Sequence, residues 1–164
     1  MSRVPTSSLI DLIELAQEPS SAKRRELLRQ VTGIFMTNPE EISGPEMELY
    51  DSVMSQLAAD METAVRAEIS TTISQTRNAP LGLLRRLASD DIAVAEPILT
   101  RSQALSETDL MHIVSTQGQD HLRAVSKRDT VPESVSGVIV NRGDDTTLHT
   151  LLSNDGARLS RATN

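Results

Sequence analysis

The sequence predicts an all-α fold of short helices that stack as repeats, and two observations carry that prediction. Aromatic residues make up only 1% of the chain, so the core must come from aliphatic side chains and Met, which suits closely packed helices better than a sheet. An apolar pattern also recurs about every 26 residues in the C-terminal half, and repeats on this scale bury their apolar faces only by stacking on neighbours. The recurring positions are Leu84, Leu87 and Ala88, then Leu110, Ile113 and Val114, then Val135, Val138 and Ile139.

The N-terminal part, residues 1–78, is expected to hold a helical hairpin followed by a long amphipathic helix. Residues 7–17 place apolar side chains on one helical face, and the segment around Pro19 ends that pattern. A second helix is expected to begin near Ser21 and to end before Pro39, because the residue that precedes a proline is disfavoured in the α region.

A capping box predicts the start of the long helix, with Ser43 as N-cap and Glu46 reaching back to it. No Gly or Pro interrupts residues 46–76, and their apolar positions alternate steps of three and four, which is typical of a coiled coil. This helix could therefore form a homodimer, or it could pack on the two helices before it. A shift of the apolar seam also allows a break near residue 60. The seam positions are Met47, Tyr50, Met54, Leu57, Met61 and Ala64.

The second part, residues 79–164, is expected to contain six short helices whose ends are marked by polar residues and glycines. An Asp at an N-cap satisfies free backbone N–H groups, a Gly after a helix favours a left-handed C-cap, and Ser106 with Asp109 resembles a further capping start. The Asp positions are Asp91, Asp120 and Asp145, the Gly positions are Gly118, Gly143 and Gly156, and the expected helices are 80–89, 91–101, 106–117, 120–128, 132–142 and 145–153.

Three segments of the repeat region resemble a known family. They are the runs Leu87–Leu99 (LASDDIAVAEPIL), Asp120–Arg128 (DHLRAVSKR) and Leu151–Asn154 (LLSN). Over at least residues 79–160 they are similar to an uncharacterised bacterial family, number 2336 among the domains of unknown function. The resemblance implies a short right-handed α-α superhelix of HEAT-like repeats preceded by an N-terminal helical segment, and it implies no activity, cofactor or binding residue. Its members often continue beyond this length, so the chain would be a fragment or would end where a second domain begins.

The residues that usually carry catalysis or metal binding form no known pattern here. The chain has no cysteine, and its three histidines, His112, His121 and His149, lack the spacing of a helical zinc site. Three pairs of neighbouring carboxylates lie at expected helix starts, where negative charge complements the helix dipole. They are Glu40/Glu41, Asp90/Asp91 and Asp144/Asp145. We therefore expect no enzyme, cofactor, catalytic residue or metal site. The remaining alternative is a hydrolase assembled from His121 and nearby carboxylates.

The net charge of −7 narrows the range of partners. An acidic protein repels a phosphate backbone and an anionic membrane surface unless its cations are concentrated on one face. No apolar stretch approaches the roughly 20 residues that span a bilayer, and no secretory signal is visible. We therefore expect a cytoplasmic protein with no membrane association, for which nucleic acid is an unlikely partner.

One group of cations could nevertheless line up when the repeats stack. Such a stripe could bind an acidic peptide, a phosphorylated partner or nucleic acid, or its members could pair with neighbouring carboxylates. The leading hypothesis is a non-enzymatic protein–protein interaction or scaffold module with an unknown protein partner. A nucleic-acid-binding helical repeat protein is the alternative. The candidate binding residues are Arg85, Arg86, His121, Arg123, Lys127, Arg128 and Arg142.

Overall fold

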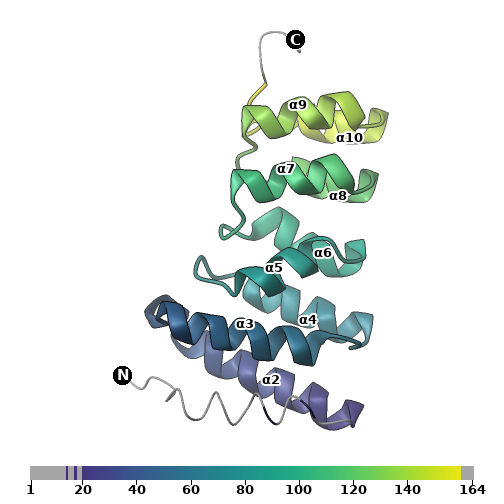
Figure 1. Ribbon diagram of the computed structural model, residues 1–164. Helices are drawn as coiled ribbons and strands as arrows, with labels where there is room; N and C mark the ends of the chain where they lie inside the picture. Colours follow the sequence, from purple (N-terminus) through teal and green to yellow (C-terminus); the bar gives the residue numbers. More distant parts are fainter. Residues whose placement is uncertain (1–13, 15–16, 18–19, 160–164) are drawn as a thin grey trace.

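The computed structural model describes residues 14, 17 and 20–159, and within these it is all-helical, with nine α-helices and one 3₁₀ turn (Figure 1). The helix expected over residues 7–17 lies largely outside the described residues. The six helices expected in the repeat region are confirmed to within two residues at each end. The helices are α2 (Ser21–Thr37), α3 (Gly44–Ala58), α4 (Thr63–Ile73), α5 (Leu81–Ala88), α6 (Ile92–Arg101), α7 (Glu107–Thr116), α8 (Gln119–Ser126), α9 (Glu133–Arg142) and α10 (Asp145–Leu152), and the 3₁₀ turn is η1 (Pro39–Glu41).

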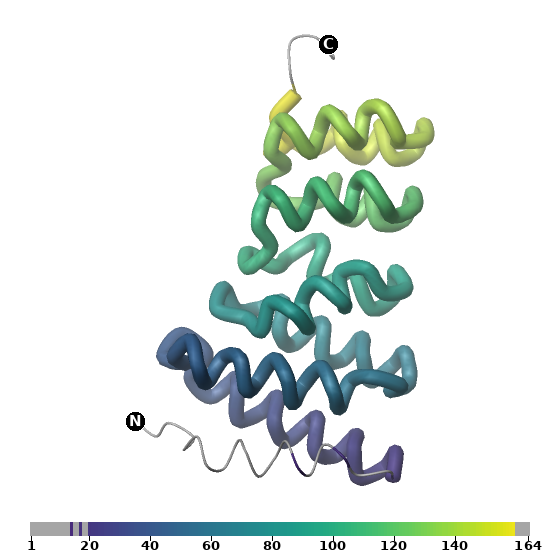
Figure 2. The backbone as a smooth tube through the Cα atoms, viewed as in Figure 1, coloured from purple at the N-terminus to yellow at the C-terminus, as the bar shows by residue number. Residues whose placement is uncertain are grey.

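The helices stack as two layers along one axis, as the backbone tube in Figure 2 shows. In the first layer α4 packs on α6, α6 on α8 and α8 on α10, so this layer is continuous. In the second layer α3 packs on α5 and α7 packs on α9. Successive helices α5 with α6, α7 with α8, and α9 with α10 hold the two layers together. This arrangement is the stacking that the apolar repeat predicts.

The apolar repeat positions form the core. All nine residues of the recurring trios are buried except Val138, which is half-buried. A single cluster of buried side chains extends from Leu28 to Leu151, and α4 packs on α6 across the predicted division at residue 78. The division of the chain into residues 1–78 and 79–164 stays a prediction.

The long helix expected over residues 46–76 is two helices, so the expectation of one continuous helix is wrong and the break near residue 60 is confirmed. Between α3 and α4, Asp60 adopts a φ of 65°. This left-handed conformation ends α3, and a short polar side chain tolerates it better than most. The seam residues Tyr50, Met54 and Leu57 are buried inside the chain's own core, as the packing alternative predicts.

The helix starts follow the expected chemistry more closely than the helix ends. The capping boxes at Ser43 and Ser106 are both present. Asp91 occupies the N-cap of α6 without a side-chain cap bond, whereas Asp144 caps α10 in place of Asp145. Asp120, also expected as an N-cap, lies inside the first turn of α8.

The expected left-handed glycine C-caps are wrong, because no described glycine has a positive φ. Gly118 is the N-cap of α8, and Gly143 ends α9 with a φ of −69°. Gly156 is needed for a different reason. A Cβ there would lie 1.8 Å from the Asp129 carbonyl oxygen, so only glycine allows these two backbone segments to approach.

Candidate functional site

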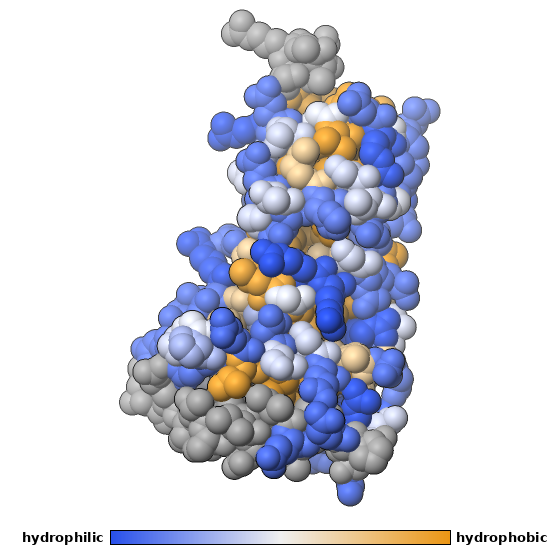
Figure 3. Space-filling model, in the orientation of Figure 1, coloured by the Kyte–Doolittle hydropathy of each residue, from blue (hydrophilic) through white to orange (hydrophobic). Residues whose placement is uncertain are grey.

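The second layer of the stack opens between α5 and α7. These two helices make at most marginal contact, although the helices on either side of them pack normally along the same layer. The opening forms a groove of about 560 Å³, and apolar surface is visible in the gap between α5 and α7 in Figure 3. The groove is lined by Arg85, Arg86, Ala88, Ser89, Leu105, Thr108, Asp109, His112 and Ile113.

The groove has an apolar floor and a polar rim. Ala88, Leu105 and Ile113 form the floor and are themselves almost completely buried. Ser89, the C-cap of α5, and Thr108 on α7 are exposed at the rim. A groove of this shape can take an apolar side chain from outside while polar groups fix its orientation.

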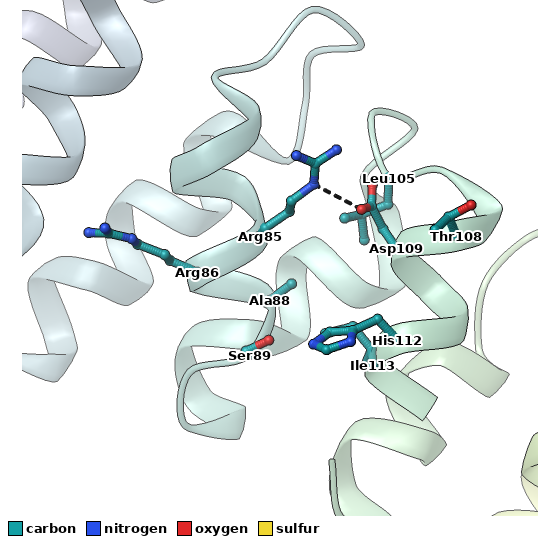
Figure 4. A pocket seen from close by; sticks show the side chains of 9 residues that line it. All are labelled: Arg85, Arg86, Ala88, Ser89, Leu105, Thr108, Asp109, His112 and Ile113. Atoms are coloured by element: carbon teal, nitrogen blue, oxygen red, sulfur yellow. Dashed lines mark hydrogen bonds and ion pairs between the residues drawn. The ribbon is translucent and has the colours of Figure 1, made fainter. Parts of the chain in front are cut away.

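An ion pair crosses the groove. The Nε of Arg85 on α5 donates to the Oδ1 of Asp109 on α7 at 2.9 Å, and Figure 4 shows this bond as the link between the two helices. The side chain of Arg85 is 56% exposed, whereas that of Asp109 is only 12% exposed. The two terminal nitrogens of Arg85 donate no hydrogen bond to any described residue.

The carboxylate of Asp109 is held in its charged form. Burial raises the pKa of Asp109, but the Ser106 backbone and side chain, together with Arg85, outweigh it and lower the pKa below its ordinary value. Asp109 also closes the capping box of α7, where the Ser106 N–H donates to its Oδ2 at 3.0 Å. The acidic side of the ion pair is therefore fixed by two independent contacts.

Arg86 is a second exposed cation beside the groove. In Figure 4 its side chain extends away from Arg85, to the other side of α5. It borders the α5–α7 groove and also two hollows between α3 and α5, and it forms no hydrogen bond or ion pair with the described part of the chain. The third polar group of the rim, His112, is exposed, and its ring lies toward Ser89 at the end of α5.

Two of the predicted binding residues instead cap helix ends in the neighbouring unit. Arg128 donates to the Leu99 and Ser102 carbonyl oxygens, at 2.8 and 2.7 Å, where α6 ends. Arg142 donates in the same way to the carbonyls at the end of α7. Burial lowers the pKa of the Arg128 guanidinium from its ordinary value, as expected for a cation inside the stack.

The other predicted binding residues also divide between internal and exposed positions. Arg123 forms ion pairs with Asp120 and Asp144, and His121 is buried with its Nε2 2.8 Å from the Asp90 carbonyl oxygen. Lys127 is exposed. Of the seven residues, the structure brings only Arg85 and Arg86 to the groove. Partner binding by the other five stays a prediction.

A buried polar cluster beside His121 was not expected from the sequence. Asp90 accepts two hydrogen bonds from Arg66, at 2.7 and 3.0 Å, and both side chains are about one-fifth exposed. Burial raises the pKa of Asp90, but Arg66 and the Asp91 N–H outweigh it and lower the pKa. The hydrogen bonds of this cluster join α4 and α8 to the loop between α5 and α6.

The sequence analysis missed most of the groove. The expected capping start placed Asp109 at the beginning of α7, and its separation of 24 residues from Arg85 is close to the repeat period. That spacing could have suggested a contact between equivalent positions of successive units. The residues missed are Ser89, Leu105, Thr108, Asp109 and the rim position of His112.

In residues 14, 17 and 20–159, no group of three or more His, Asp or Glu side chains could hold a metal ion. None of the helices in this part of the chain is both long and apolar enough to cross a bilayer. The acidic pairs lie at helix starts, as the sequence predicts: Glu40/Glu41 in η1, Asp90/Asp91 just before α6, and Asp144/Asp145 at the N-cap and first residue of α10.

Comparison with protein families identifies a relationship for the C-terminal part of the chain. Residues 94–164 match the model of a family described as "Uncharacterised protein conserved in bacteria (DUF2336)". The match begins within α6 and includes the α7 side of the groove, whereas α5 lies before it. The match supports the expected family for residues 94–164, it does not extend to residues 79–93, and the HEAT-like description stays a prediction. No curated protein and no solved structure matches the chain.

Proposed function

We propose that the chain is a non-enzymatic protein–protein interaction module that binds a partner in the α5–α7 groove. The opening of one layer is the observation that carries this proposal. The floor side chains of the groove are buried and apolar, so a partner's apolar side chain placed there would leave water at little cost in lost polar contacts. Stacked helical repeats commonly bind partners along such surfaces.

The proposal includes the HEAT-like superhelix and the cytoplasmic location expected from the sequence. The two-layered stack supports the superhelix, and the lack of cysteine supports the cytoplasmic location. It does not include a homodimer through residues 46–76, since the apolar seam of that region packs within the chain.

A selection from an unbiased peptide-display library on the purified chain tests the proposal. The bait is compared with a variant in which the groove is filled, Thr108→Trp, and with the matched surface variant Thr146→Trp on α10. Both threonines are exposed, so neither substitution alters the core. We expect peptides whose binding is abolished by Thr108→Trp and unchanged by Thr146→Trp.

Ser89→Trp, on the α5 side of the groove, provides a second filled variant. Circular dichroism and thermal unfolding confirm that each variant is folded before binding is measured. A selection that yields only peptides insensitive to both filled variants would refute the groove as the binding site.

A further inference from the structure

We propose that the partner of this groove presents an acidic amphipathic helix, and that one of its carboxylates binds the terminal nitrogens of Arg85. This inference rests on the proposed function and specifies the chemistry of the partner. It follows from three features of the groove: free cationic donors at the rim, an apolar floor, and a carboxylate that already occupies one side of the same guanidinium.

The free donors point to a carboxylate. Arg85 uses its Nε for Asp109, which leaves the two terminal nitrogens without a partner in the described residues. Arg86 adds a second exposed and unpaired cation on the same helix. A guanidinium presents its N–H groups in a planar fork that matches a carboxylate, and such charge-assisted bonds are stronger than neutral ones.

The shape of the groove points to a helix. The groove runs between two neighbouring helices of one layer, and an added helix would place its side chains between their ridges. Apolar side chains three or four residues apart would contact Leu105 and Ile113, while an acidic residue on the flank would face Arg85. Strand addition has no comparable support, since the described residues contain no strand and only one isolated β-bridge.

The surrounding charges oppose a nucleic acid. Asp109 lies in the groove, and Glu48 and Asp51 line the hollow on the other side of Arg86. A row of phosphates would meet these carboxylates as well as the two cations, on a chain of net charge −7. A helix with a single carboxylate near Arg85 meets less of that repulsion than a row of phosphates does, because Asp109 is then the one carboxylate close to it.

Asp109 makes the inference testable through a gain of affinity. Its carboxylate shares Arg85 with the incoming group and repels it. Asp109→Asn keeps an oxygen that can accept from the Ser106 N–H and removes the negative charge. The variant is therefore expected to bind an acidic helix more tightly, an effect that a poorly folded protein cannot produce.

The probe is a fluorescein-labelled synthetic peptide of about 16 residues, long enough to hold a helix, with Leu at successive i and i+4 positions and Glu on one flank. Its matched control carries Gln at every Glu position. Fluorescence anisotropy at low salt gives Kd for the native chain and its variants. We expect the Glu peptide to bind at least tenfold more tightly than the Gln peptide, as expected for a hydrogen bond to a charged group.

Three variants test the assignment of Arg85. Arg85→Gln should weaken binding of the Glu peptide about tenfold. Asp109→Asn should strengthen it about fivefold, the effect of removing a like charge roughly 4 Å away in water. Arg101→Gln removes an exposed cation at the end of α6, outside the groove, and should leave Kd unchanged.

The outcomes separate this inference from the proposed function. Peptides selected from the library that bind in the groove but carry no acidic residues would overturn the acidic helix and leave the groove as a binding site. A selection without any peptide sensitive to the filled groove would overturn both. Equal binding of the Glu and Gln peptides, or weaker binding of the Glu peptide to Asp109→Asn, would overturn the role of Arg85. A gel shift of this chain with DNA at low salt would overturn the preference for a peptide.

Discussion

Replacing Arg128 by Ala should destabilise the whole stack, although the sequence alone suggests a surface cation available to a partner. The guanidinium lies after α8 and reaches back to the last carbonyls of α6, at Leu99 and Ser102. Both of these residues are completely buried, so no bulk water is adjacent to replace the lost donor. Lys127, directly beside Arg128, is exposed and provides a control that removes the same charge.

The size of the effect follows from the two hydrogen bonds. A hydrogen bond to a charged group contributes about 1.5–3 kcal/mol, and Arg128→Ala leaves two carbonyl oxygens without their donor. Water that enters the space left by the side chain recovers part of this loss. We therefore expect the free energy of unfolding to fall by about 2–4 kcal/mol. For a chain of this size that corresponds to a Tm lower by roughly 5–15 °C.

Urea unfolding monitored by circular dichroism measures this difference. Lys127→Ala should change the free energy of unfolding by less than about 0.5 kcal/mol, as is usual for a surface substitution. The free energy of unfolding of Arg128→Lys should lie between those of Arg128→Ala and the native chain. The lysine side chain is shorter, and its ammonium group cannot present a planar fork to both carbonyls. If Arg128→Ala and Lys127→Ala are equally mild, the capping role is wrong and Arg128 is again a candidate for binding.

Three further predictions concern stability. Asp51→Ala should cost about 1 kcal/mol in urea unfolding, since Asp51 accepts from two backbone N–H groups at the start of α5, at 3.1 and 2.8 Å, in the manner of an N-cap. Asp90→Asn should cost about 1.5–3 kcal/mol by the same assay, because it removes the charge that Arg66 binds through two nitrogens. Acid should also weaken the fold. Asp90 and Asp109 have folded pKa values below the ordinary 3.8, so their stabilisation is complete above that value and is lost as pH falls through and below it. Unfolding free energies measured from about pH 5 to about pH 3 should fall, and less steeply in Asp109→Asn. An unchanged free energy across this interval would contradict the ion pairs.

The order and type of the helices could be predicted because they depend on local patterns. Apolar spacing marks the buried face of each helix, and the residues at Ser43 and Ser106 mark starts through contacts made within four positions of the chain. The helix ends could not be predicted in this way. The carbonyls at the end of α6 are satisfied by Arg128, which is 26 residues or more away in the sequence, so no glycine is required there.

The groove could not be predicted for a related reason. The same apolar positions occur in α5, α7 and α9, yet α7 packs on α9 and barely touches α5. A repeat in the sequence records which face is buried, but the separation between neighbouring helices depends on side chains and loops from several units together. Leu105, in the loop before α7, is such a residue, because it forms part of the floor between two helices to which it does not belong.

The way the units are joined explains why Arg128 and Arg142 are engaged inside the stack. At four helix ends a side chain from a neighbouring part of the stack donates to the last carbonyls. Arg24 on α2 caps the following helix α3, whereas Arg128, Arg142 and Asn154 cap the earlier helices α6, α7 and α8. Where the capping side chain is an arginine, the helix end binds its neighbour through a charge that would otherwise face solvent. Arg85 differs, because it meets a carboxylate across an open groove and keeps its terminal nitrogens exposed. Arg85 is thus available to a partner at the place where two helices of a layer separate, and among the described helices of the repeat region α5 and α7 are the pair that does so.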